Sequence, residues 1–143
     1  MTLTQNDDVR PRVLIVDDDP CLRRALARCL GAAADVTSAE SVAAAMQAID
    51  RNPDFDLILT DMMMPEGTGQ DLFHRLVEDH PTLVAHTYFV TAGVTDPNLK
   101  AFVRRHRARV LLKPLRIADV LALLPGAPSR RSGVLPRGMF EAD

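Results

Sequence analysis

Residues 13–20 have the sequence VLIVDDDP. Its apolar, β-branched run is typical of a strand that is buried on both faces, as in a parallel sheet. The run stops at three consecutive aspartates. Pro20 then fits the first position of a helix, for which Asp18 or Asp19 is the expected cap. The stretch therefore predicts a buried strand over residues 12–16 that passes through acidic residues directly into a helix.

The same alternation of a short apolar run and an amphipathic segment continues along the chain. Strands are predicted at residues 12–16, 35–38, 55–60, 83–90 and 110–112. Helices are predicted at residues 20–30, 41–50, up to about 79, 96–106 and 117–124. Five strand–helix units with right-handed crossovers give an α/β fold, a doubly wound open parallel sheet with helices on both faces.

The length and the local composition indicate one domain with two tails. A chain of 143 residues can bury about two-thirds of the surface that its unfolded form exposes. From Pro125 onward Pro, Gly, Ser and Arg dominate, with little apolar periodicity. We therefore expect a single domain over residues 11–125, a flexible N-terminal tail at 1–10 and a flexible C-terminal tail at 126–143, with no room for an output domain.

Composition excludes several classes of protein. The chain has 17 basic and 19 acidic residues, a net charge of −2, which argues against a nucleic-acid partner. No apolar run approaches the roughly 18 residues of a membrane span, and the N-terminus is not signal-like. Cys21 and Cys29 would lie about 12 Å apart on one helix, too far for a mutual disulfide. A cytoplasmic protein with no membrane partner is expected.

The residues whose side chains can take part in binding or catalysis follow the predicted strands. Asp17 and Asp18 come after the first strand, Asp61 after the third, Thr91 after the fourth and Lys113 after the fifth. In an open α/β sheet, ligands bind outside the carboxyl ends of the strands. Each residue alone has an ordinary explanation, such as a helix cap or a loop acid. Together, three carboxylates, one hydroxyl and one ammonium are expected to share a single edge of the sheet.

This set of side chains suits phosphoryl chemistry. Crowded carboxylates repel one another, and Mg²⁺ relieves that repulsion because it prefers carboxylate, water and phosphate oxygens. One carboxylate can then attack phosphorus to form an acyl phosphate. A cation, a hydroxyl and backbone amides would stabilise the charge on the phosphoryl oxygens. The sequence thus points to a Mg²⁺-dependent phosphoryl site.

The sequence resembles the receiver domains of bacterial two-component response regulators, the family of the chemotaxis regulator. VLIVDDDP at residues 13–20 matches the opening acidic pair, and DMMMPEGTG at 61–69 matches the D-x-x-M-P-x-x-x-G loop. Thr91-Ala92 and Lys113-Pro114 match the remaining landmarks. The resemblance covers roughly residues 12–124. It implies a flavodoxin-like (βα)₅ fold with strand order 2-1-3-4-5, which makes strands one and three neighbours.

The resemblance also implies a role for each acid. Asp61 would be the phosphoacceptor, taking a phosphoryl group from a phosphohistidine on a sensor histidine kinase or a histidine phosphotransfer protein. Asp18 would bind Mg²⁺ directly, and Asp17 directly or through water. Asp61 and the backbone carbonyl of Met63 would complete the protein ligands. Catalysis would be limited to the domain's own phosphorylation and dephosphorylation, so the protein is not expected to be an enzyme.

Switching is expected at the far end of the same edge. Lys113 would pair with the phosphoryl oxygens, and its peptide bond to Pro114 would be cis. Thr91, with the amide of Ala92, would close on the phosphoryl group and pass the change to protein contacts or to an onward phosphorelay. A homodimer is one such contact. The family often has an aromatic residue three positions before the lysine, but Val110 stands there, so rotation of an aromatic side chain is not available as a switch at this position.

Two alternatives remain. The chain could be the receiver segment of a hybrid sensor histidine kinase, because its last predicted helix is short. From another class, a phosphatase similar to the haloacid dehalogenase family would use Asp17-x-Asp19 and Thr60. The phosphatase alternative gives Asp61 and Lys113 no role, so their positions after the third and fifth strands would be coincidental.

Overall fold

Five parallel strands form the central sheet of the computed structural model, which describes residues 10–126. Their spatial order is β2-β1-β3-β6-β7. Along the chain they are β1 (Arg12–Val16), β2 (Asp35–Ala39), β3 (Leu57–Asp61), β6 (Thr87–Thr91) and β7 (Val110–Leu112). Counting only these five, the order is 2-1-3-4-5, and the predicted doubly wound sheet is confirmed.

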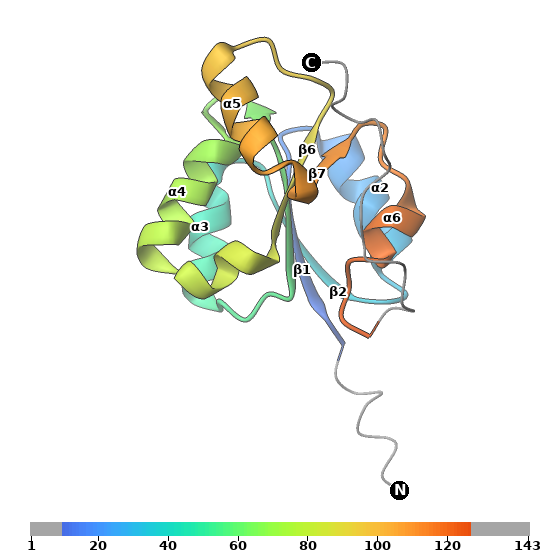
Figure 1. The fold of residues 1–143 in the computed structure, drawn as a ribbon. Coiled ribbons are helices and arrows are strands. Elements are labelled where there is room, and N and C mark those ends of the chain that lie inside the picture. The colour runs from blue at the N-terminus through green and yellow to red at the C-terminus, as the bar shows by residue number, and fades with distance from the viewer. Residues whose placement is uncertain (1–9, 127–143) are drawn as a thin grey trace, which may run out of the picture.

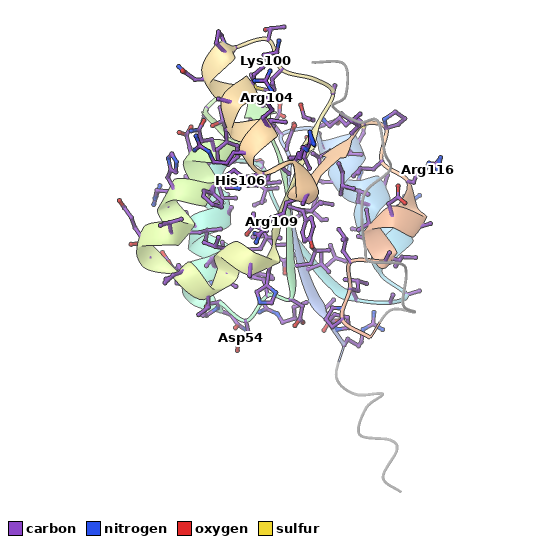
Figure 2. The ribbon with its side chains drawn as sticks, viewed as in Figure 1. Asp54, Lys100, Arg104, His106, Arg109 and Arg116 are labelled. Atoms are coloured by element: carbon purple, nitrogen blue, oxygen red, sulfur yellow. The ribbon has the colours of Figure 1, made fainter. Side chains whose placement is uncertain are left out.

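Helices cover both faces of the sheet (Figure 1). One face carries α2 (Pro20–Leu30) and the short α6 (Ile117–Leu121). The other carries α3 (Val42–Arg51), α4 (Gly69–Asp79) and α5 (Pro97–Arg105). In Figure 2, Lys100 and Arg104 project from α5, and both are exposed.

Alternate residues of each central strand enter different cores, because successive side chains of a strand point to opposite faces. In β1, Leu14 and Val16 pack in the core under α3 and α4. Val13 and Ile15 pack in the core under α2 and α6. All four are at most 1% exposed, so the continuous apolar run reflects burial on both sides. Each such buried side chain contributes roughly 1.5–3 kcal/mol of hydrophobic stabilisation.

The acidic turn after β1 sets the start of α2. Asp19 Oδ1 accepts hydrogen bonds from the backbone N–H groups of Cys21, at 2.9 Å, and Leu22, at 3.4 Å. Asp19 is therefore the cap, of the two aspartates considered, and Pro20 occupies the first turn where no N–H is needed. Cys21 and Cys29 are both free and exposed.

The expected strand over residues 83–90 is wrong in its first half. Pro81–His86 form the 3₁₀ helix η1, and β6 begins only at Thr87. Pro81 favours the start of a helical turn, and Leu83 is buried in the core under α3 and α4. The Thr87 hydroxyl donates to the Leu83 carbonyl at 2.8 Å and holds the turn against the strand. Burial of a helical turn produced the apolar run that resembled a strand.

A second difference lies between β3 and α4. The predicted loop there contains a two-stranded antiparallel hairpin, formed by β4 (Met63–Met64) and β5 (Gly67–Thr68). Thr68 then caps α4, because its hydroxyl accepts from the Asp71 N–H at 3.1 Å while Asp71 accepts from the Thr68 N–H at 2.8 Å.

The predicted tails lie outside the described residues except at their inner ends. Arg10 is described, and its guanidinium pairs with Asp35 at 3.1 Å and donates to the Ala34 carbonyl at 2.9 Å. The structure places the following residue, Pro11, beside the N-terminal end of β2 through its hydrogen bond with Asp35. Within residues 10–126, no helix has the length and apolar character needed to cross a membrane.

Candidate functional site

The predicted acids meet where β1 and β3 end. Asp17 is the first residue after β1 and Asp61 is the last residue of β3. These strands are parallel neighbours, with Val16 beside Thr60, so their carboxyl ends share one edge of the sheet. Carboxylate oxygens of Asp17, Asp18 and Asp61 all lie within 4.8 Å of one another. The sheet topology therefore assembles a three-carboxylate cluster from residues 43–44 positions apart in the chain.

The three acids differ in burial and in hydrogen bonding. Asp17 is 4% and Asp61 is 6% exposed, whereas Asp18 is exposed to solvent. Asp17 Oδ1 accepts from the Asp19 N–H at 2.9 Å, and Asp61 Oδ1 accepts from the Met63 N–H at 3.3 Å. Backbone hydrogen bonds thus fix one oxygen of each buried carboxylate.

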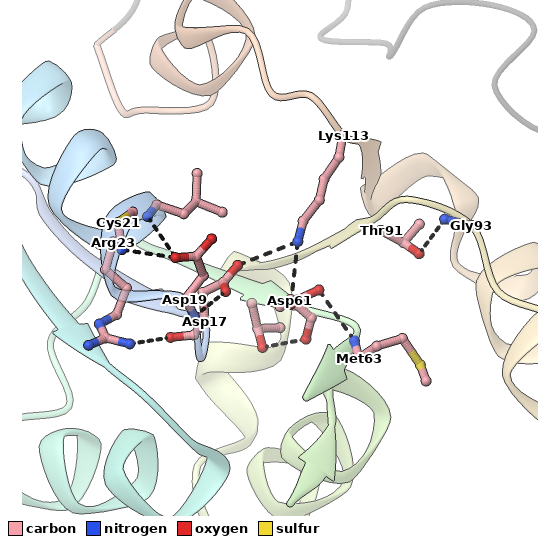
Figure 3. A network of polar contacts seen from close by, with 11 residues as sticks. Asp17, Asp19, Cys21, Arg23, Asp61, Met63, Thr91, Gly93 and Lys113 are labelled. Atoms are coloured by element: carbon pink, nitrogen blue, oxygen red, sulfur yellow. Dashed lines mark hydrogen bonds and ion pairs between the residues drawn. The ribbon is translucent and has the colours of Figure 1, made fainter. Parts of the chain in front are cut away.

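Lys113 bridges the two buried acids (Figure 3). Its Nζ lies 3.4 Å from Asp61 Oδ2 and 3.7 Å from Asp17 Oδ2. The side chain reaches the site from just beyond β7, and the Lys113 backbone N–H bonds to the Thr91 carbonyl at 2.9 Å. The Lys113–Pro114 peptide bond is cis. One ammonium therefore faces a cluster of three carboxylates.

Burial and charge act together on Asp61. Loss of solvent raises the pKa of its carboxyl group above the ordinary value, and the neighbouring Asp17 carboxylate raises it further. Lys113 and the Met63 N–H lower it but do not cancel the increase. The site therefore has excess negative charge that a further cation would relieve. Its donors are carboxylate oxygens, which fit Mg²⁺ as a hard cation.

Thr91 and Ala92 lie at the same edge but do not complete this charge cluster. Thr91 is buried, and its hydroxyl accepts a hydrogen bond from the Gly93 N–H at 2.9 Å (Figure 3). Gly93 has φ of 124°, a conformation that L side chains rarely adopt and that lets the chain turn back over the hydroxyl. Ala92 is exposed. The structure thus brings Asp17, Asp18, Asp61 and Lys113 together and leaves the Thr91 hydroxyl directed toward its own loop.

The last glycine of the DMMMPEGTG motif has a steric explanation. A Cβ atom on Gly69 would lie 3.1 Å from both the Asp61 carbonyl oxygen and the Phe89 ring. The Gly69 N–H also bonds to the Met62 carbonyl at 3.0 Å. A Cβ atom here would be in tighter contact than usual with the end of β3, which favours glycine where α4 begins.

An aromatic cluster lies beside the site and was not predicted. Val110 is fully buried and pairs with Phe89 across β6 and β7. Around Phe89 pack Phe73 from α4 and Phe102 from α5, with ring centroids 5.9 and 5.2 Å away. The ring centroid of His106, just after α5, lies 4.4 Å from that of Phe102. The helices α4 and α5 thus supply aromatic rings next to Val110 of β7, which has none. The only sign of these contacts in the sequence was a phenylalanine on the apolar face of each helix.

His106 is electrostatically affected by this position. Burial against the rings lowers its pKa, and the positive charges of Arg109 and Arg105, followed by His74, lower it further. The neutral imidazole is therefore favoured at the junction of α5 and the sheet.

The acidic turn also bears on the phosphatase alternative. That scheme needs a second acid at Asp19, but Asp19 is the α2 cap and its oxygen is bonded to two backbone N–H groups. Asp61 and Lys113 instead lie next to Asp17, where the phosphatase scheme has no use for them.

Comparison with known proteins agrees with this geometry. The model of the response regulator receiver domain family matches residues 13–124. CpdR, a response regulator receiver protein of Brucella abortus, is 34% identical over 114 residues, which cover 77% of this chain and 90% of CpdR. A response regulator receiver protein structure from Pseudomonas putida superposes with a TM-score of 0.66 at 27% identity, covering 80% of this chain and 95% of that chain.

Other relatives are much longer proteins. The response regulator PilR of Pseudomonas aeruginosa is 44% identical over 73 residues, and this match covers 50% of this chain but 16% of PilR. The sensor histidine kinase TmoS of Ectopseudomonas mendocina is 38% identical over 122 residues, covering 84% of this chain and 12% of TmoS. Because the family model matches residues 13–124 and the match to CpdR covers 90% of that protein at 34% identity, this chain belongs to the response regulator receiver domain family of two-component signalling.

Proposed function

We propose that Asp61 accepts a phosphoryl group from a phosphohistidine on a sensor histidine kinase or a histidine phosphotransfer protein. The observation that carries this proposal is the pairing of Asp61 with Lys113 Nζ, 3.4 Å away, inside a cluster of three carboxylates. A nearly buried carboxylate with a cation beside it and a solvent-facing acid next to it is poised for nucleophilic attack on phosphorus.

The transfer is a displacement at phosphorus. A carboxylate oxygen of Asp61 forms a bond to phosphorus as the bond from phosphorus to the histidine nitrogen breaks, and the imidazole leaves with the electron pair. The ammonium of Lys113 balances charge on the phosphoryl oxygens. The carboxylates of Asp17, Asp18 and Asp61, with the Met63 carbonyl, would hold Mg²⁺. When bound, that ion supplies positive charge to the phosphoryl oxygens and offsets the repulsion among the acids.

The response follows from the position of Thr91. Turning its hydroxyl from the Gly93 N–H toward a phosphoryl group, with the Ala92 amide as a second donor, would pull on the segment that leads into α5. α5 is tied to β6 by the contact between Phe102 and Phe89. The change would therefore reach the surface at α5 and β7 without an aromatic residue at Val110, and would be relayed to another protein, a second copy of the chain included.

A second arrangement is supported by the similarity to a sensor histidine kinase. The match to TmoS covers more of this chain than the match to CpdR does, at comparable identity. In this arrangement the domain would act as the receiver segment of a hybrid kinase, and Asp61 would pass its phosphoryl group onward in a phosphorelay.

The test is intact-mass analysis after incubation with Mg²⁺ and acetyl phosphate. The wild type is expected to gain one phosphoryl group that hydroxylamine removes, because an acyl phosphate is labile to that nucleophile. Asp61→Asn should gain none, and Asp54→Asn, which removes an exposed carboxylate elsewhere, should behave as the wild type. No adduct on the wild type, or an equal adduct on Asp61→Asn, would refute the proposal.

A further inference from the structure

An apolar groove runs along α2 and meets the phosphoryl site at Lys113. It has a volume of about 550 Å³ and is lined by Leu22, Ala25, Leu26 and Cys29 from α2 and by Leu115 and Ile117 from the segment after β7. A volume of this size accommodates several side chains. We call this feature the α2 groove.

The groove exists because the apolar stripe of α2 is only partly covered. Leu22, Ala25, Leu26 and Cys29 follow helical spacing and so lie on one side of the helix. Leu26 is buried, but Ala25 and Cys29 are exposed. The facing helix, α6, has five residues, about half the length of α2, and cannot cover the whole stripe. An apolar stripe left partly open in this way can receive apolar side chains from another segment.

The chain itself contains a segment of matching character. Residues 134–140, with the sequence VLPRGMF, are the only markedly apolar stretch after the described residues end at 126. Their chemistry fits the open stripe. Two acids come after them, Glu141 at the next position and Asp143 two positions later.

Charge on α2 complements those acids. The helix has three arginines and no acidic residue. Arg23 donates to the Asp17 carbonyl, whereas Arg24 and Arg28 are exposed on the surface of the helix. A segment with apolar side chains followed by carboxylates therefore meets both the apolar and the basic character of α2.

The connection is long enough. Leu124 is buried in the same core as Leu26 and Leu30, so the chain leaves the domain beside α2. The eight residue-to-residue steps from 126 to 134 span at most about 26–29 Å when extended. The eleven residues of α2 extend about 16 Å. A tether this short also gives an effective concentration on the order of 1 mM, so even a weak contact is populated.

We propose that residues 134–140 of this chain bind in the α2 groove and cover it. The bound segment lies beside Lys113 and Pro114, which form the end of the groove nearest the phosphoryl site. It would therefore compete with any protein that approaches the site over α2.

Cys29 and Cys21 provide an internal test. Both thiols are exposed and both lie on α2, but only Cys29 lines the groove. Alkylation of each thiol would be followed by peptide mass spectrometry in the full chain, in a double variant Leu135→Asp with Phe140→Asp, and in a control Ser129→Asp with Ser132→Asp. The control adds the same charge outside the proposed segment.

In the double variant we expect Cys29 to react about fourfold faster than in the wild type, for a contact with a dissociation constant near 0.3 mM at an effective concentration of ~1 mM. Cys21 should react equally in all three proteins, and the control should match the wild type. Equal Cys29 rates in all three would overturn the proposal. So would protection that increases with protein concentration, which would identify a second copy of the chain as the occupant.

A disulfide test places the segment directly. In a Cys21→Ser background, Phe140→Cys is expected to form an intramolecular disulfide with Cys29 on mild oxidation, whereas Ser129→Cys is not. Equal crosslinking of the two would mean random collision of the tail with α2 and would contradict specific binding. Neither test involves phosphorylation, so the outcome is independent of the function proposed for Asp61.

Discussion

The two halves of the sheet's carboxyl edge are built in different ways. At β1 and β3 the edge holds two buried carboxylates, each fixed by a backbone N–H and both facing Lys113. At β6 the edge holds a buried hydroxyl above a packed aromatic cluster. The first half contains unbalanced negative charge, and the second half is tightly packed. Charge suits a reaction, whereas packing suits transmission of a change in shape.

Because the two halves are built differently, their roles can be tested independently. Removing charge at β1 and β3 should affect phosphorylation and its pH dependence. Altering the rings next to β6 should affect the response of α5 and leave the reaction intact.

The largest effect is expected for Lys113→Met. This change removes the ammonium that faces both Asp17 and Asp61, so the phosphoryl oxygens lose a charged partner. Phosphorylation by acetyl phosphate should slow by roughly 10²-fold, the scale for loss of one such stabilising group. Time-resolved intact-mass measurements would give the rate. The matched control is Lys100→Met on the exposed surface of α5. Equal rates for the two variants would show that the Lys113 ammonium does not assist phosphorylation.

Phe102→Leu should affect the packing half. The ring packs on Phe89 and Phe73, and its replacement by a smaller aliphatic group should lower the free energy of unfolding by about 1–2 kcal/mol. Phosphorylation should proceed as in the wild type, but the phosphorylation-dependent change in amide exchange over α5 should fall by at least half. Hydrogen exchange measured by mass spectrometry tests both statements.

Phe55→Leu is the matched control, because Phe55 is buried in the core under α3 and α4. The Phe55→Leu variant should be less stable than the wild type but keep the phosphorylation-dependent change in amide exchange over α5. If Phe102→Leu also keeps the whole change, the aromatic cluster does not transmit the signal.

The smallest effect is expected from Asp61→Asn on stability without Mg²⁺. The pKa of Asp61 is raised in the folded state, so ionising it costs free energy that appears as the pH rises through that pKa. Near neutral pH the variant should therefore be more stable than the wild type by about 1 kcal/mol, because Lys113 and the Met63 N–H offset part of the cost of ionising Asp61. The difference should vanish in acid, below the ordinary carboxyl pKa, where Asp61 is protonated in both the folded and unfolded states.

Urea denaturation over a range of pH would measure this difference. Asp54→Asn, at an exposed site, should stay within about 0.5 kcal/mol of the wild type throughout. A constant difference between Asp61→Asn and wild type at every pH would show that charge at Asp61 is not the cause.

The acidic half of the edge was predictable because its signals are local in the sequence. An apolar run followed at once by acids indicates both where the strand lies and that the acidic side chains lie at its carboxyl end. The strand order then brings Asp17 and Asp61 together. That Asp17 and Asp61 are buried while Asp18 is exposed was not predictable, because it depends on the direction in which the turn into α2 points each carboxylate.

The packing half depends on contacts between distant segments. Phe73 and Phe102 belong to different helices, and only the tertiary arrangement places both rings on Phe89. The same reason explains the error at residues 83–86. An apolar run there is buried as a 3₁₀ turn, and periodicity over so few residues does not distinguish that turn from a strand.

The most direct measurement of the central claim is to locate the acyl phosphate itself. Protein phosphorylated with acetyl phosphate and Mg²⁺ would be reduced with borohydride, which converts a phosphorylated aspartate to homoserine, and then digested for peptide sequencing by mass spectrometry. Homoserine is expected at position 61 alone. Homoserine at position 17 or 18 would show that the acceptor is one of the carboxylates proposed to bind Mg²⁺, and that Asp61 is not the acceptor.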